Sequence, residues 1–187
     1  MTKRGYRKNR GDVLHRKDLS LLALGLVLSF SLVCPLAAIA VDSEVTRATI
    51  TGLKGVHVMV EDLNPNVLNY EKYLKKIDLS SASLQKNVEA RLKQAGIRVL
   101  TREEWLQTTG RPALCITVNT HESEKYWFAY DSRIELRQIV FLESNPALRT
   151  WAPTWSINIT GLTHIGALNV IKTDTLVMVE QFIKALK

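Results

Sequence analysis

The sequence predicts an α+β domain with two layers, in which two long helices cover one face of a mixed, mainly antiparallel sheet. Three patterns support this prediction. An alternating strand at 56–61 precedes an amphipathic helix at about 81–95. Residues 126–142 keep apolar side chains on one parity and polar ones on the other, which is typical of an antiparallel strand with one buried face. A second helical stripe runs from about 165 to 186.

The first half of the domain is predicted to form a right-handed strand–helix–strand unit that ends in a strand at 97–100. Residues 41–52 have mixed polarity, so we expect a lead-in or at most an edge strand, and 62–70 are expected to be loop. The helix begins after Ser80, which can cap its free amides, and ends at Gly96. Its buried stripe consists of Leu84, Val88, Leu92 and Ala95.

The second half is predicted to be a meander of antiparallel strands. Thr101 and Glu104 form a capping-box pattern, so a short helix that carries Trp105 should separate the two halves. Strands are expected at about 113–120, 126–142 and 154–160. The last helix should then return across the sheet to complete the second layer.

Residues 1–40 have the parts of an export signal. A basic head precedes an apolar run at 19–40, and Ala38 and Ala40 fit the small-x-small pattern of a signal-peptidase site. We expect cleavage after Ala40, which leaves a single domain at 41–187. This domain is expected to be periplasmic or secreted. The alternative is an uncleaved anchor in the inner membrane, because the apolar run approaches the ~20 residues that span a bilayer.

The charge of the domain is close to neutral, although the whole chain carries +7. Residues 1–40 hold seven of the 25 Lys and Arg and two of the 18 Asp and Glu, so the domain itself carries +2. We therefore expect no nucleic-acid partner. Only Cys115 remains after cleavage, and one cysteine cannot form an internal disulfide, so the core must hold the domain together.

Aromatic residues are the candidate binding residues. Trp151 and Trp155 flank a short Ala-Pro-Thr segment, and Trp127 lies in a second aromatic group. An exposed pair of tryptophans could bind a peptide, a glycan or a partner protein. The alternative interpretation is that these side chains pack at one end of the sheet.

A weak metal-site candidate is formed by His121, Glu122 and Glu124, which bring nitrogen and oxygen donors close together in the sequence. A zinc enzyme needs three converging ligands, whereas this run is predicted to be a polar hairpin. The chain has neither Gly-x-x-x-x-Gly-Lys nor Gly-x-Gly-x-x-Gly, the two glycine-rich phosphate loops, and no cofactor is expected.

Four segments carry a resemblance to known proteins. They are Gly55–Leu63, Val88–Leu100, Tyr130–Gln138 and Thr154–Trp155. Through them, residues from about 52 to 186 resemble a widespread family of uncharacterised exported bacterial proteins. This resemblance implies export and no particular activity. The strand–helix–strand start is also similar in topology to the amino-terminal domain of the periplasmic protein TolB.

We expect a non-catalytic envelope protein that acts as an interaction or binding module for an envelope protein or peptide. Two alternatives stay open. The first is a secreted hydrolase or metal-dependent enzyme around His121, and the second is a protein that binds a small ligand between helix and sheet. A membrane would be a partner only through residues 19–40, if these stay attached.

The export prediction can be tested on the mature protein. Because Ala38 and Ala40 fit the signal-peptidase pattern, mass spectrometry of the purified protein should find Val41 as the first residue. A chain that retains residues 19–40 in the membrane fraction would favour the anchor instead.

Overall fold

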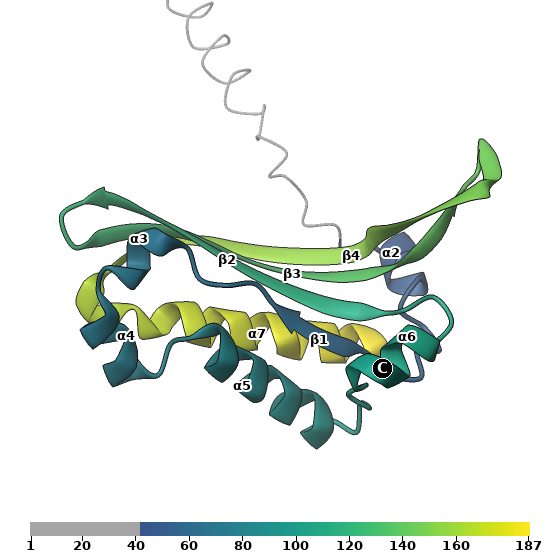
Figure 1. Cartoon of the computed structure of the whole chain (residues 1–187), viewed down its shortest axis with the longest axis horizontal. Helices are drawn as coiled ribbons and strands as arrows, with labels where there is room; N and C mark the ends of the chain where they lie inside the picture. Colours follow the sequence, from purple (N-terminus) through teal and green to yellow (C-terminus); the bar gives the residue numbers. More distant parts are fainter. Residues whose placement is uncertain (1–41) are drawn as a thin grey trace, which may run out of the picture. The chain divides into compact units, whose positions relative to one another are not determined.

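The computed structural model describes residues 42–187, so the predicted leader and its cleavage site after Ala40 lie outside the described residues (Figure 1). The helices are α2 (Glu44–Ala48), α3 (Pro65–Leu68), α4 (Glu71–Ile77), α5 (Ser81–Gln94), α6 (Arg102–Gln107) and α7 (Asn169–Leu186). The strands are β1 (His57–Val60), β2 (Ala113–Glu124), β3 (Trp127–Leu142) and β4 (Asn145–His164). None of the helices within 42–187 is long and apolar enough to cross a membrane.

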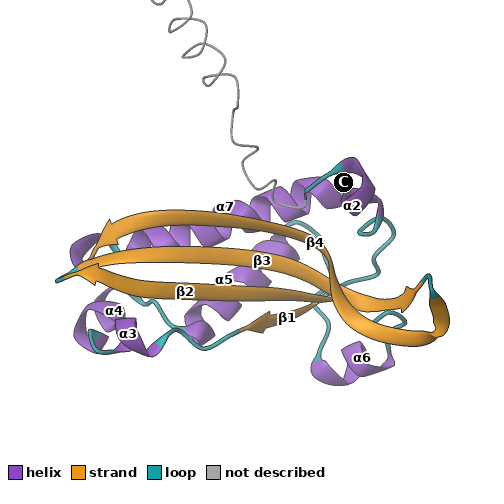
Figure 2. Ribbon diagram, turned by 90° about the horizontal axis from the view of Figure 1, so that it is seen from above, coloured by secondary structure: helices purple, strands orange, loops and turns teal. Residues whose placement is uncertain are grey.

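The four strands form one mixed sheet in the order β1-β2-β3-β4 (Figure 2). β1 is parallel to β2, whereas the sequence predicted the segment at 97–100 as its parallel partner. As predicted, β2, β3 and β4 form an antiparallel meander. The segment predicted as a strand at 97–100 contributes only an isolated parallel bridge, between Val56 and Val99. Both long helices, α5 and α7, lie on the same face of the sheet (Figure 1). The predicted two-layer α+β fold is therefore confirmed.

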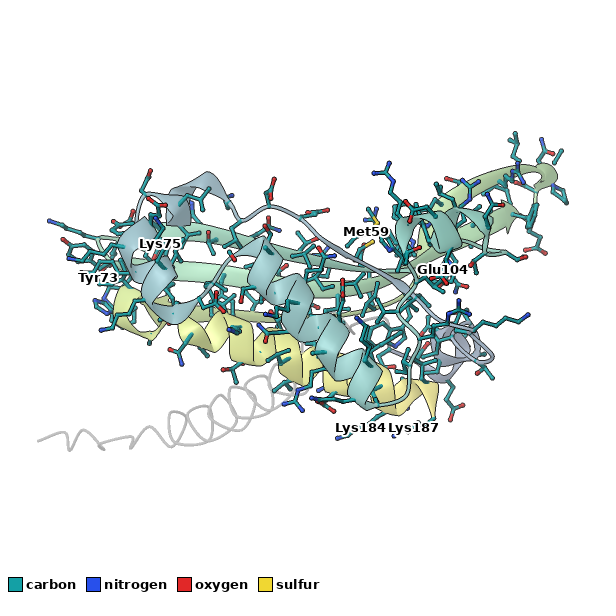
Figure 3. All side chains as sticks on the ribbon, turned by 60° about the horizontal axis from the view of Figure 1, so that its bottom comes forward. Met59, Tyr73, Lys75, Glu104, Lys184 and Lys187 are labelled. Atoms are coloured by element: carbon teal, nitrogen blue, oxygen red, sulfur yellow. The ribbon has the colours of Figure 1, made fainter. Side chains whose placement is uncertain are left out.

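The hydrophobic core fills the space between the sheet and these two helices. The predicted stripe of α5 is buried at Leu84, Val88 and Leu92, each of which contributes ~1.5–3 kcal/mol through burial. α5 and α7 lie side by side beneath the sheet (Figure 3), and Arg91 and Glu180 join them through an ion pair of 3.4 Å. The opposite face of the sheet is not covered by either long helix, and we call it the open face.

Two short helices, α2 and α3, form where the sequence predicted a lead-in and a loop, so those predictions were wrong. A third, α4, lies at 71–77, where no helix was predicted. α2 is stabilised by a capping box in which Ser43 and Thr46 bond each other's backbone N–H. The helices α2, α3 and α4 have only five, four and seven residues, too few to repeat an apolar stripe.

β4 begins at Asn145, well before the start predicted at about 154. Its first residues are exposed on both faces of the strand, so no alternation marks them in the sequence. They pair with the end of β3 beyond Arg137, the last β3 residue that β2 reaches. Residues 138–152 thus form a two-stranded arm, which bends away from the layer of helices (Figure 1).

A β-bulge at the base of the arm changes the face on which β4 side chains lie. Leu136 pairs with Trp155, whereas the next residue of β3, Arg137, pairs with Pro153, so Thr154 is the extra residue. Pro153 has no N–H to donate to the ladder. Thr154 is held in place by a hydrogen bond of 2.9 Å from the Gln138 side chain and by one of 3.3 Å from the Thr49 hydroxyl to its carbonyl.

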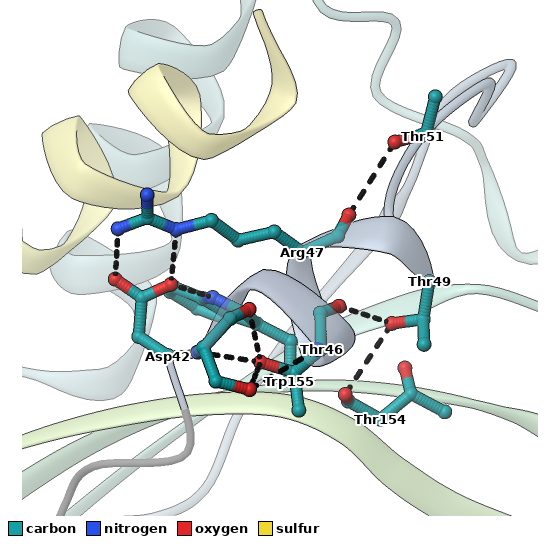
Figure 4. Close-up of polar contacts among 8 residues, drawn as sticks. Asp42, Thr46, Arg47, Thr49, Thr51, Thr154 and Trp155 are labelled. Atoms are coloured by element: carbon teal, nitrogen blue, oxygen red, sulfur yellow. Dashed lines mark hydrogen bonds and ion pairs between the residues drawn. The ribbon is translucent and has the colours of Figure 1, made fainter.

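The bulge sends Trp155 into the core, where it is 0% exposed and contacts Phe182 of α7 at 5.3 Å between ring centroids. Its indole N–H donates to Asp42 Oδ1 at 2.9 Å (Figure 4). Arg47 binds the same carboxylate through two hydrogen bonds of 2.7 Å. These contacts hold the start of the described chain against the sheet.

A substitution at Val88 tests how α5 packs in the core. Val88→Asp would place an unpaired charge at a site that is 0% exposed, and we expect it to lower the free energy of unfolding by about 4 kcal/mol or more. Urea denaturation followed by circular dichroism measures this loss. The control is Ala90→Asp on the exposed side of the same helix. Equal stability of the two variants would contradict the packing of α5.

A substitution at Asp42 tests the hydrogen bond that its carboxylate accepts from Trp155. The hydrogen bonds from Arg47, and then that from Trp155, lower the Asp42 pKa below 3.8 in the folded chain. A lowered pKa means that the carboxylate stabilises the fold above the unfolded value and loses this effect as pH falls through the folded value. Asp42→Asn should therefore cost about 1 kcal/mol at neutral pH, and this cost should shrink as the pH falls below the ordinary pKa of an aspartate.

Denaturation at neutral and at acidic pH measures the difference. Glu44→Gln, which changes an exposed carboxylate in the first turn of α2, is the control and should show a smaller effect at neutral pH. A cost of Asp42→Asn that does not change with pH would contradict the ionised contact.

Candidate functional site

The candidate site is a pocket of about 400 Å³ between the arm and α6, at the end of the sheet seen on the right of Figure 2. Trp105 of α6 and Arg111 of the following loop form one side. The arm forms the other with Ile139, Arg149, Thr150 and Trp151. We call it the Trp105–Trp151 pocket. Its volume lies in the range of small-ligand sites.

Trp151 lies on the opposite side of β4 from Trp155 because of the bulge. It pairs with Ile139, and it contacts Arg137, whose guanidinium lies 5.5 Å from the centre of the Trp151 ring. The indole N–H of Trp151 donates to the backbone carbonyl of Arg111 at 3.3 Å. Arg137 is itself held by Glu135, at 2.7 Å. The ring is therefore fixed on two sides.

Trp105 is fixed by the short helix that the sequence predicted. Thr101 and Glu104 form the expected capping box at the start of α6, and Glu104 also pairs with Arg98. The Trp105 ring stacks on His57 with 5.4 Å between centroids and meets Trp151 edge to face at 6.1 Å. The three rings form a continuous aromatic contact from β1 to the arm.

Arg111 and Arg149 make the pocket positive. Within residues 42–187 neither guanidinium forms an ion pair, and the lining includes no acidic residue. Arg91, Arg133 and Arg137, by contrast, are paired with carboxylates. Two unpaired guanidinium groups beside two indoles can bind an anionic group through planar, charge-assisted hydrogen bonds.

The predicted tryptophan residues do not form one site. Trp155 is a core residue, so the hypothesis of an exposed Trp151–Trp155 pair was wrong, and for Trp155 the other interpretation, packing within the fold, is the one that holds. Trp127 is 42% exposed and lies at the other end of β3, where it contacts His164 edge to face at 5.4 Å. Of the three, Trp151 alone lines the pocket.

The weak metal candidates also fail to converge. His121 and Glu124 are exposed, and Glu122 accepts hydrogen bonds from the Tyr70 hydroxyl at 2.5 Å and from the Tyr126 backbone at 3.0 Å. The bond from Tyr70 is the main reason that the Glu122 pKa is lowered. Across 42–187, no group of three or more His, Cys, Asp or Glu side chains could hold a metal ion.

Cys115 lies on the open face of β2, opposite Met59 and Glu135, and is 8% exposed. Burial raises the pKa of its thiol to about 11. The thiolate that acts as a nucleophile is therefore scarce at neutral pH.

Comparison with known proteins gives no match among protein families, curated proteins or solved structures. The resemblances to an exported family and to the TolB domain stay predictions. The description of the site therefore depends on its own geometry.

The positive potential of the pocket can be tested with ionic quenchers. With each quenching constant divided by that of free tryptophan, iodide should quench the protein's fluorescence more strongly than caesium at equal ionic strength, because Arg111 and Arg149 attract the anion to Trp105 and Trp151. Arg149→Gln should reduce iodide quenching. Arg102→Gln removes an exposed charge outside the lining and should have little effect. Equal quenching by both ions in all proteins would contradict an anion-attracting pocket.

Proposed function

We propose that this chain is an exported envelope protein that acts as a non-catalytic binding module, and that it binds an envelope protein or peptide in the Trp105–Trp151 pocket. One observation carries the proposal: two indoles and two guanidinium groups without carboxylate partners in 42–187 face one open pocket. Tryptophan and arginine are the side chains most enriched where binding energy concentrates in protein interfaces.

The rigidity of the pocket supports the same function. Trp151 is held by the Arg111 carbonyl and Arg137, and Trp105 is held by His57 and the capped helix α6. Binding then orders few side chains of this protein, which lowers the entropic cost of association. The basic head and apolar run at 1–40 support the envelope location.

Site-specific photocrosslinking in producing cells tests this proposal. A photoreactive amino acid at Thr150, in the pocket lining, should give a discrete crosslinked product with an envelope component. The same group at Lys75, on α4 at the other end of the molecule (Figure 3), is the control and should not.

Trp151→Ala should weaken the Thr150 product at least about tenfold, because it removes one wall of the pocket. Identical products from Thr150 and Lys75, or a product that persists unchanged in Trp151→Ala, would refute binding at this site.

A further inference from the structure

The arm carries a strand edge beside the pocket, and this edge has no backbone partner beyond Ile139 within residues 42–187. Ile139 N–H donates to the carbonyl of Gly110 at 2.7 Å, so the outer edge of β3 already accepts one backbone partner at the base of the arm. Hydrogen-bonding groups alternate between the two edges of an antiparallel strand, so the backbone groups of Phe141 face the same outer edge. Within 42–187, no segment outside the arm forms a backbone hydrogen bond with Phe141. One extended peptide backbone could therefore pair with the outer edge of β3 next to Gly110.

The side chains beside this edge define what such a segment would carry. Phe141 is 66% exposed and pairs with Arg149, so an apolar ring and a guanidinium lie next to each other on the arm. Arg111 follows Gly110 directly, so it lies where the added segment would begin to pair with β3. A carboxylate on the added segment would meet Arg149 or Arg111 in a bidentate contact, and an apolar neighbour would lie against Phe141 or an indole.

We infer that the Trp105–Trp151 pocket recognises an extended, acidic peptide segment of a partner protein, which adds as a strand to the outer edge of β3 and places a carboxylate on Arg111 and Arg149. This inference rests on the proposed binding function and names the partner's chemistry. Backbone pairing supplies affinity that does not depend on sequence, and the two guanidinium groups supply the selection for acid.

The probe for the test is a phage library that displays random short peptides, selected on the protein purified from the envelope of cells that produce the full chain. Selected peptides should be enriched in Asp or Glu flanked by apolar residues. Enrichment of neutral or basic peptides, or no enrichment, would overturn the inference.

A synthetic copy of the best selected peptide then gives the matched comparison. Replacing its acidic residue by Gln or Asn should weaken binding about tenfold, as should Arg149→Gln or Arg111→Gln in the protein. Arg102→Gln, which is exposed and outside the lining, is the control for charge and for folding and should bind as the unchanged protein does.

Two further measurements separate the possible outcomes. Methylation of the peptide's backbone nitrogens should abolish binding if the segment pairs as a strand; unchanged binding would overturn strand addition. Benzoate bound as tightly as the peptide would identify a small-carboxylate site and also overturn the inference. If the Thr150 crosslink persists while acidic peptides fail to bind, the binding function stands and only the partner's chemistry is wrong.

Discussion

The extra residue in β4, Thr154, is the constraint on which the site depends. In a regular strand, residues four positions apart lie on the same face, so Trp151 and Trp155 would both enter the core or both leave it. The bulge reverses the parity between them. Trp155 can therefore bind Asp42 and pack on α7, while Trp151 forms the wall of a pocket on the other side of the same strand.

The middle of β3 and its end in the arm are stabilised by different contacts. Near its middle, β3 packs on α7 and its residues Ile134 and Leu136 are buried. The polar Ser132 is tolerated there because its hydroxyl bonds that of Thr175 at 2.8 Å. Beyond Arg137, the arm has its partner strand, the aromatic contact from Trp151 to Trp105 and a few hydrogen bonds, among them those to the carbonyls of Gly110 and Arg111. A two-stranded ribbon is marginally stable by itself. The indole contacts thus both shape the pocket and hold the arm, which couples local stability to binding.

The sequence predicted those parts of the fold that repeat over many residues. The stripe of α5, the alternation of β3 and the last helix all had enough turns or residue pairs to be recognised, and the capping box located α6. The short helices α2, α3 and α4 and the first part of β4 gave no such signal. The burial of Trp155 could not be predicted, because Pro153 marks an interruption of the ladder without revealing which residue becomes the extra one.

The pocket was predicted only in part for a related reason. Trp151 was a candidate, and Trp105 was placed on the correct helix, but Arg111 and Arg149 lie 38 positions apart and meet only because the arm bends over the loop before β2. No local pattern encodes that contact. The unpaired state of the two guanidinium groups likewise depends on where every carboxylate of the fold lies.

Hydroxyl-radical footprinting with mass spectrometry tests the central claim most directly, because it reports the solvent access of each tryptophan separately. The bulge predicts that Trp151 and Trp127 are oxidised while Trp155 is protected in the folded protein, and that all three react alike after denaturation. Equal oxidation of Trp151 and Trp155 in the folded protein would contradict the assignment of these two side chains to opposite faces of β4.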